Sequence, residues 1–364
     1  MGRSPIGVGI VGLSASGGWA GAAHVAAIRA VDGLELRAVA GSSPQSARAA
    51  ATAFDVPAGC GSVEELVARD DVDLVVVSVR VPRHYELVLP ILESGKIAFC
   101  EWPLARTLDE ARSLAAMAPP DSFVGLQGRS APVSRFVRDL VADGVVGTVQ
   151  STDVVGCAPP WGGPMDEQSA YLLDRTNGAT MLSIPTAHTL DTVESVLGDL
   201  ATVTGTMARV RDRVPRVGGG ELALAADDQV VLSGRLATGA VASIHYRGGT
   251  VPTPRFRWEI QGDGASLEVL NDASTLNRGA VVVRAHHVDA PSRDLPVPDG
   301  YDEYPELRGT QAHVVAHAYA AIVRDLASGS RTAPRFTDAL RLHELLDLAE
   351  RASRDQSTVP PRPE

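Results

Sequence analysis

Lysine is almost absent from this sequence. Lys96 is the single lysine among 364 residues, so arginine supplies every other fixed positive side chain. Acidic residues outnumber basic ones by 44 to 33, which gives a formal net charge of -11. Direct binding to nucleic acid or to an anionic membrane needs a basic face that displaces counterions. The charge balance therefore argues against both partners and favours a small molecule.

Cysteine and long apolar runs are scarce as well. Cys60, Cys100 and Cys157 are too few and too widely spaced for a disulfide framework or a metal-ligand cluster, so we expect reduced thiols and no metal site. No apolar run approaches the roughly 20 residues that span a bilayer. Residues 1–20 hold glycine and serine where a signal peptide has its apolar core. We therefore expect a cytoplasmic protein.

Apolar strand patterns alternate with helical patterns over the first third of the chain. The stretch 74–79 is apolar throughout, as expected of a strand buried on both faces. Such alternation indicates parallel strands joined by right-handed crossovers. We predict a Rossmann-type, doubly wound parallel sheet in residues 1–127. Its predicted strands are 6–13, 34–40, 74–79, 97–100 and 123–126, and its predicted helices are 44–54, 63–68, 83–93 and 107–117.

The remainder of the chain has mainly strands that alternate apolar and polar residues, the pattern of half-buried antiparallel strands. We predict an α/β domain with a mostly antiparallel open sheet in residues 128–354, followed by a flexible tail, 355–364. An open sheet associates readily, so we expect a homo-dimer or homo-tetramer. The predicted strands are 149–155, 201–210, 230–236, 240–246, 255–261, 265–270 and 280–285; the helices are 132–143, 313–327 and 337–354, the last two packing back on the first domain; and the surface loops are 218–220 and 289–300.

A glycine-rich segment follows the first predicted strand and opens a helix. It reads Gly9-Ile-Val-Gly12-Leu-Ser14-Ala-Ser-Gly17-Gly18. In this context backbone amides can approach a pyrophosphate at the helix N-terminus. Ser14 replaces the middle glycine of the usual fingerprint. We predict dinucleotide binding here; the alternative is a tight turn that binds nothing.

The end of the second predicted strand lacks the acidic residue that holds the ribose hydroxyls of NAD. The chain reads Gly41-Ser42-Ser43 there, and Arg48 follows on the next helix. Hydroxyl groups and a guanidinium suit a 2'-phosphate, so NADP(H) is favoured over NAD(H), which stays possible. Arg48 is otherwise a solvated helix residue.

The chain resembles the glucose-fructose oxidoreductase / inositol dehydrogenase (Gfo/Idh/MocA) family over nearly its whole length. The resemblance rests on the glycine-rich start, on His84 ahead of a helix, on Lys96 leading into the strand that ends at Pro103, and on the pair His188 and Asp191. Some segments are most similar to the branch that contains the yeast galactose-regulon repressor, a nucleotide-binding regulator. They are Gly-Trp19-Ala, His84-Tyr85-Glu86, Glu101-Trp102, Leu126-Gln-Gly-Arg129 and Gly300-Tyr301-Asp302.

The resemblance implies a dinucleotide cofactor, a sugar-like substrate and a crevice between the two domains. It assigns cofactor contacts to Trp19, His84 and Glu101. Arg80 stands where the family usually has proline, and the resemblance places it close to the cofactor.

Two departures from the family concern acid/base chemistry. The enzymes typically read Glu-Lys-Pro, with the lysine acting on the substrate hydroxyl, whereas this chain reads Glu101-Trp102-Pro103. Their aspartate four residues before the histidine is replaced by Ile184. Lys96 precedes its strand, at the end away from the crevice, and cannot easily substitute. His188 remains the best general acid or base because its pKa is near neutral.

Other candidates complete the predicted site. Asp191, one helical turn after His188, would orient it or cap an amide. Trp102 would stack on a sugar or on the nicotinamide, or simply fill the space of the lysine. Arg129 would contact a ligand, Trp161 would rim the pocket and Tyr171 would line it; each of these side chains, His188 included, is open to a purely structural interpretation.

Three functions follow. The first is an NAD(P)-dependent oxidoreductase acting on a sugar, cyclitol or sugar-like carbonyl, with His188 moving the proton. The second is a catalytically silent nucleotide-binding sensor or transcriptional regulator. The third is a redox-neutral epimerisation or elimination with bound nucleotide.

Overall fold

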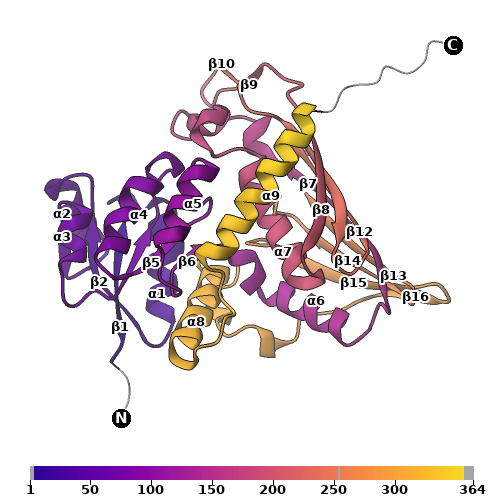
Figure 1. The fold of residues 1–364 in the computed structure, drawn as a ribbon, viewed down its shortest axis with the longest axis horizontal. Coiled ribbons are helices and arrows are strands. Elements are labelled where there is room, and N and C mark those ends of the chain that lie inside the picture. Colours follow the sequence, from indigo (N-terminus) through magenta and orange to yellow (C-terminus); the bar gives the residue numbers. More distant parts are fainter. Residues whose placement is uncertain (1–3, 253–254, 356–364) are drawn as a thin grey trace.

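A computed structural model describes residues 4–252 and 255–355. Its first domain is a six-stranded sheet in the order β3-β2-β1-β4-β5-β6, and every pair of neighbours is parallel (Figure 1). The order reverses between β1 and β4, so a crevice opens there, outside the carboxyl ends of the strands. The strands are β1 (Ile6–Val11), β2 (Leu34–Ala40), β3 (Ala58–Cys60), β4 (Leu74–Val77), β5 (Ile97–Glu101) and β6 (Phe123–Gly125).

Helices connect these strands and begin where the sequence supplies hydrogen-bonding caps. Ser43, Ser62 and Thr107 each accept a hydrogen bond from the amide three residues on, which satisfies a free donor of the first turn. The strand predicted to be buried on both faces is buried at every residue of β4. The helices are η1 (Ala20–Val25), α1 (Ala26–Ala30), α2 (Pro44–Ala53), α3 (Val63–Val67), η2 (Val81–Arg83), α4 (His84–Glu93) and α5 (Leu108–Met117).

The second domain is an eight-stranded sheet in the order β16-β15-β14-β13-β7-β12-β11-β8. Its pairs are antiparallel except β7 with β12, which confirms the predicted mostly antiparallel sheet. Residues 263–265 join β13 to β14. The strands are β7 (Val149–Ala158), β8 (Leu200–Ala208), β11 (Gln229–Leu236), β12 (Val241–Gly248), β13 (Phe256–Gly262), β14 (Ser266–Asn271), β15 (Val281–His287) and β16 (Ala290–Asp294), with a separate hairpin of β9 (Arg213–Pro215) and β10 (Glu221–Ala223).

One predicted loop is wrong. Residues 289–300 contain β16, whose Asp294 and Arg293 pair with Arg284 and Ala285 of β15. All five residues of β16 are exposed, so the segment lacks the buried side chains that would reveal a strand by alternation.

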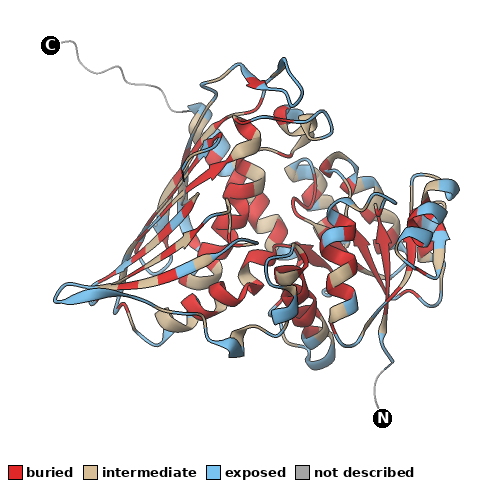
Figure 2. Ribbon diagram, turned by 180° about the vertical axis from the view of Figure 1, so that it is seen from behind, coloured by how far each residue is buried: buried red, intermediate tan, exposed pale blue. Residues whose placement is uncertain are grey.

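Helices lie between the large sheet and the first domain, as Figure 1 shows for α6 (Pro132–Ala142), α7 (Ala187–Leu197) and α9 (Phe336–Asp355). Buried residues gather on these helices and on the parallel strands, whereas residues of β12 and β13 alternate between buried and exposed (Figure 2). Short turns precede α7: η3 (Gln127–Ser130), η4 (Pro159–Trp161), η5 (Ala170–Leu173), η6 (Arg175–Asn177) and η7 (Leu182–Thr186).

The last two helices pack on the first domain, as the sequence predicts. Ala312, Val315 and Tyr319 of α8 (Ala312–Ser328) share one buried cluster with the first strand and helix. α9 contacts α5 and β6 on one side and β8 on the other. It ends at Asp355, so the remainder of the predicted tail, 356–364, lies outside the described residues. No helix in the described part of the chain is both long and apolar enough to cross a membrane.

The turn from α8 to α9 depends on Asp325. This buried carboxylate accepts hydrogen bonds from the amides of Thr332 and Ala333 and from the hydroxyls of Ser330 and Thr332, at 2.7–3.0 Å. Burial raises the pKa of Asp325, but these donors outweigh it and leave the pKa below its ordinary value. The carboxylate therefore holds the turn in its charged form.

Replacing Asp325 with Ala should lower the free energy of unfolding by about 3 kcal/mol or more, because buried donors lose a charged acceptor. Chemical denaturation measures the loss, and Asp212→Ala, at an exposed position, should cost less than about 0.5 kcal/mol. Since the folded-state pKa of Asp325 is lowered, its contribution is complete above about pH 4 and is lost as the pH falls further. Equal stability of the two variants would contradict this account.

Candidate functional site

The glycine-rich turn brings the end of β1 against the segment that follows β4. Gly12 has φ +103°, and a Cβ there would lie 2.3 Å from the carbonyl oxygen of Ser78, so no other residue fits without moving the backbone. Gly17 and Gly18 also have positive φ, and Gly17 donates its amide to the carbonyl of Ser14 at 2.9 Å. Trp19, 37% exposed, stands where the helix begins. This is a cradle that side chains leave open to a phosphate.

The residues predicted to face a 2'-phosphate lie after β2. Ser42 and Arg48 are exposed, and Arg48 forms no hydrogen bond or ion pair with the described residues. Ser43 caps α2, where its hydroxyl accepts the amide of Ser46 and its own amide donates to the Ser46 hydroxyl. Ser42 and Arg48 are therefore free for a ligand, whereas the Ser43 side chain is in use.

His84 is buried and bridges two loops. Its Nδ1 lies 2.7 Å from the carbonyl of Pro103, and its Nε2 lies 3.0 Å from the carbonyl of Val79. Burial lowers the pKa of His84. The side chain thus connects the end of β4 to the loop after β5. Both of its nitrogens are paired, so it would influence a cofactor indirectly, by positioning the backbone of these two segments.

Glu101, at the end of β5, belongs to a buried polar chain. It accepts a hydrogen bond from Gln127 Nε2 at 2.8 Å, and its Oε1 lies 3.1 Å from His24 Nε2, off the direction of a hydrogen bond. The Nδ1 atom of His24 pairs with the Tyr319 hydroxyl at 2.8 Å. This series of polar contacts connects η1, the end of β5 and α8, so Glu101 is held in one position.

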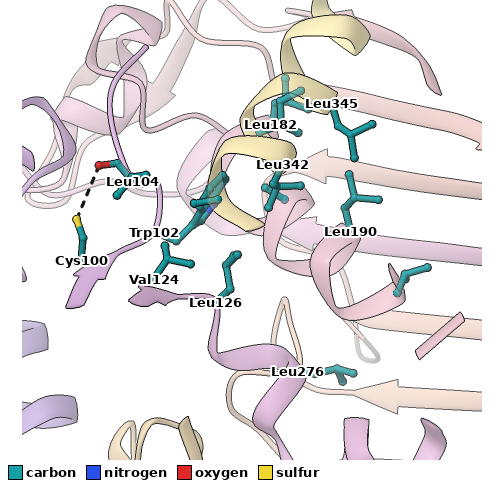
Figure 3. Packing of buried hydrophobic residues seen from close by; sticks show 14 of the residues in the cluster. Cys100, Trp102, Leu104, Val124, Leu126, Leu182, Leu190, Leu276, Leu342 and Leu345 are labelled. Atoms are coloured by element: carbon teal, nitrogen blue, oxygen red, sulfur yellow. Dashed lines mark hydrogen bonds between the residues drawn. The ribbon is translucent and has the colours of Figure 1, made fainter. Parts of the chain in front are cut away.

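Trp102 crosses from the first domain to the second. Its indole N–H donates to the carbonyl of Ser183 at 2.6 Å, and its ring packs on His343 of α9 with centroids 4.7 Å apart. Figure 3 shows the side chain pointing from the end of β5 toward Leu342. Trp102 is almost fully buried. It fills the interdomain space at the place of the family lysine and supplies no proton carrier there.

Arg129 and Asp191 form an ion pair. Arg129 Nε donates to Asp191 Oδ2 at 3.1 Å, a second bond joins Nη2 to Oδ1, and Nη1 lies 3.4 Å from Asp338 Oδ1. Burial acts to lower the pKa of Arg129, but the two carboxylates raise it above its ordinary value. The Asp191 carboxylate therefore pairs with Arg129. Among the described residues it forms no hydrogen bond with His188, so the expectation that it orients His188 is not supported.

His188 lies on the first turn of α7. Burial lowers the pKa of His188 to about 4, although the charge of Glu101 acts in the opposite direction. Its Nδ1 lies 3.4 Å from the side-chain amide of Asn277. The imidazole is consequently neutral at pH 7, with one nitrogen able to donate a hydrogen bond and the other able to accept a hydrogen bond or a proton.

The three remaining candidates meet where the segment after β4, which holds Arg80, contacts the loop that holds Trp161 and Tyr171. Arg80 donates to the carbonyl of Gln168 at 2.7 Å and lies over the ring of Tyr171 at 4.8 Å. Trp161, expected at a rim, is buried and donates its indole N–H to the carbonyl of Leu172 at 3.0 Å. Arg80 and Tyr171 thus close the domains together, while Trp161 supports the loop from inside.

Sequence reasoning missed several residues of the site. His24, Asn277 and His343 carry no motif, and each reaches the site only through folding. The pair His313 and His317 had a signal, because residues four apart lie on one face of a helix. Lys96 was placed correctly: it lies at the opposite end of β5 and donates to the carbonyl of Arg69 at 2.8 Å.

Comparison with known proteins places both domains. Residues 6–124 match the family model described as "Oxidoreductase family, NAD-binding Rossmann fold", and residues 132–270 match the model of the Gal80p C-terminal domain. The first domain therefore resembles the Gfo/Idh/MocA oxidoreductases, and the second resembles the C-terminal domain of Gal80p. The predicted fold class, a Rossmann-type parallel sheet followed by a mostly antiparallel sheet, is confirmed.

Three curated proteins illustrate these similarities. A dehydrogenase named aclE from Aspergillus oryzae is 37% identical over 174 residues, 46% of this chain and 47% of its own length. The galactose/lactose metabolism regulatory protein GAL80 of Saccharomyces cerevisiae is 26% identical over 344 residues, 84% of this chain and 77% of its own. Levoglucosan dehydrogenase of Pseudarthrobacter phenanthrenivorans is 25% identical over 263 residues, 65% of this chain and 66% of its own.

Two solved structures have the same fold. A super-repressor mutant of Gal80p from Saccharomyces cerevisiae superposes with a TM-score of 0.86 at 21% identity, covering 96% of both chains. A levoglucosan dehydrogenase in complex with NADH and L-sorbose gives a TM-score of 0.79 at 19% identity and covers 96% of this chain and 97% of its own. The fold is therefore common to a regulator and to a dehydrogenase.

Replacing Trp102 with Ala should destabilise the protein by about 3–5 kcal/mol, because it leaves a cavity between the domains. Trp102→Phe keeps an aromatic ring but loses the bond to Ser183 and part of the packed volume, so it should cost less than the alanine variant. Denaturation in urea measures both. An alanine variant as stable as the phenylalanine variant would contradict the packing role of the indole.

Proposed function

We propose that this protein is an NAD(P)-dependent oxidoreductase that acts on a sugar, cyclitol or sugar-like carbonyl. The observation that carries the proposal is His188, a neutral imidazole near the carboxyl edge of the parallel sheet, with an amide as its only hydrogen-bonding partner among the described residues. Trp102 and Asp191 are engaged elsewhere. The nicotinamide would supply the hydride, and His188 would give a proton to, or take one from, the reacting oxygen.

The residues present fit a dinucleotide. The backbone at Gly12 approaches the carbonyl of Ser78, and a helix begins directly after the glycine-rich turn, so a pyrophosphate would lie at the N-terminus of that helix. Gln127 and His24 fix Glu101 beside this position, while Arg80 holds the covering loop. These contacts would hold a substrate in a fixed orientation relative to the cofactor. Fixing that geometry in advance lowers the entropic part of the barrier.

His188→Ala should abolish the loss of absorbance at 340 nm when the protein, loaded with NADPH or NADH, is given a panel of anhydrosugars, ketoses and cyclitol ketones. Nucleotide affinity, measured by calorimetry, should stay within about threefold, because His188 lies outside the phosphate cradle. An alanine variant with full turnover would overturn the assignment of His188.

Because burial lowers the pKa of His188 to about 4, the imidazole stays neutral from pH 5 upward. The acid limb of kcat/KM should therefore lie near pH 4, well below the ordinary value of about 6.5. A profile measured from pH 3.5 to 8 tests this. An acid limb near 6.5 in the parent chain would contradict the buried, neutral imidazole.

The proposal extends to NADP(H) over NAD(H). Ser42, after β2, and Arg48, on α2, are both exposed. Arg48 forms no hydrogen bond or ion pair with the described residues, so binding a phosphate would break no existing contact. Arg48→Ala should weaken NADPH binding about tenfold, about 1.4 kcal/mol, and leave NADH binding unchanged. Arg83→Ala, which removes an exposed arginine elsewhere, is the matched control; equal effects of Arg48→Ala on both nucleotides would contradict the preference.

A second function, a nucleotide-dependent sensor without turnover, is favoured by one specific observation. The place of the family lysine is filled by Trp102, which is tied to Ser183 and His343 and moves no proton. Tight binding of NADPH with no hydride transfer to any tested carbonyl would support the sensor. Turnover of substrate without net loss of NADPH would instead support the redox-neutral epimerisation or elimination.

A further inference from the structure

A cluster of two histidines and an aspartate lies apart from the crevice. His313 and His317 face the same side of α8, and the loop containing η8 (Asp299–Tyr301) and η9 (Pro305–Leu307) brings Asp302 against them. His313 Nε2 lies 2.9 Å and His317 Nε2 lies 3.2 Å from the same oxygen, Asp302 Oδ1. The three ligand atoms all lie within 4.8 Å of one another.

From this geometry we propose that Asp302, His313 and His317 bind a divalent transition-metal ion, with Zn²⁺ as the first probe. Imidazole nitrogen and carboxylate oxygen are common zinc ligands, with bonds of about 2.0–2.2 Å. Tetrahedral bonds of that length place neighbouring ligand atoms about 3.2–3.6 Å apart. The two distances to Asp302 Oδ1 are within a few tenths of an ångström of that range, so a metal needs only small side-chain shifts.

Both histidines and Arg308 already point at the carboxylate of Asp302, which accepts from each of them. A metal ion needs a charged carboxylate and neutral imidazoles as ligands, so it would take the place of the protons that these imidazoles share with Asp302.

Surrounding groups can orient the ligands. Arg308 bonds to the second oxygen of Asp302, which leaves Oδ1 toward the histidines. The Nδ1 atom of His317 lies 3.8 Å from Glu303 Oε1 and 3.4 Å from Arg135 Nη2. When Nε2 binds the metal, the proton must sit on Nδ1, so this nitrogen would turn from Arg135 to the Glu303 carboxylate, an arrangement that orients many metal-bound histidines.

A cavity gives such a metal an open side. Asp302 and His313 line a hollow of about 630 Å³, together with Arg278, Thr310 and Val281. His317 is 1% exposed and lies behind them. Three protein ligands beside a space large enough for a small molecule is the arrangement of zinc sites that keep a position for water or an exogenous oxygen ligand. The test measures metal binding itself and does not depend on hydride transfer.

The test is a calorimetric titration of the metal-free protein with Zn²⁺, repeated with Co²⁺ while the visible spectrum is recorded. We expect one ion per chain and a cobalt spectrum of nitrogen and oxygen ligands without thiolate bands. His313→Gln and Asp302→Asn should each weaken Zn²⁺ binding about a hundredfold. His287→Gln, an exposed histidine on β15, is the matched control and should bind like the parent chain.

Circular dichroism checks that each variant is folded. Should Asp302→Asn unfold, His313→Gln at the cavity wall still decides the matter, because it keeps the buried Asp302 and His317 in place. Absence of Zn²⁺ binding by the parent chain, or equal binding by His313→Gln, would overturn the proposal and leave the cluster as a clasp that holds the loop on α8.

Discussion

The position of α7 depends on one buried ion pair, between Arg129 and Asp191. Arg129 lies in η3, just after the first domain, pairs with Asp191 on α7 and approaches Asp338 on α9. Breaking a buried pair leaves an unpaired charge, which costs far more than an exposed pair gains. Because α7 also carries His188, the same pair sets where the imidazole lies relative to the segment that follows β6.

This constraint explains which groups are left for chemistry. Once Asp191 holds Arg129 and Trp102 bonds to Ser183, neither Asp191 nor Trp102 is available to a substrate without breaking one of these bonds. His188 keeps a neutral ring and a single weak contact to Asn277. An enzyme with this site relies on the orientation of its substrate and on His188 as the single proton carrier. A sensor could use the same fixed contacts to hold a bound nucleotide without turnover.

The sequence predicts the fold far better than the site. Period and burial reveal the strands, since β4 is apolar throughout and β12 alternates; exposed β16 shows neither pattern. Side-chain partners are another matter: Trp102 meets a carbonyl 81 residues away, and Asp191 meets an arginine 62 residues away. The motifs place these residues near one another, as the structure does. Spacing along the chain cannot tell whether the Asp191 carboxylate pairs with His188 or with Arg129.

One measurement separates catalysis from sensing most directly. The protein would be incubated with NADPH carrying deuterium at the transferable position of the nicotinamide, together with a metabolite extract from its source cells, and the small molecules would be analysed by mass spectrometry. An oxidoreductase predicts deuterium in a sugar-like product, and none when His188→Ala replaces the parent chain. Deuterium that stays in the nucleotide, in a protein that binds NADPH, would contradict the central claim.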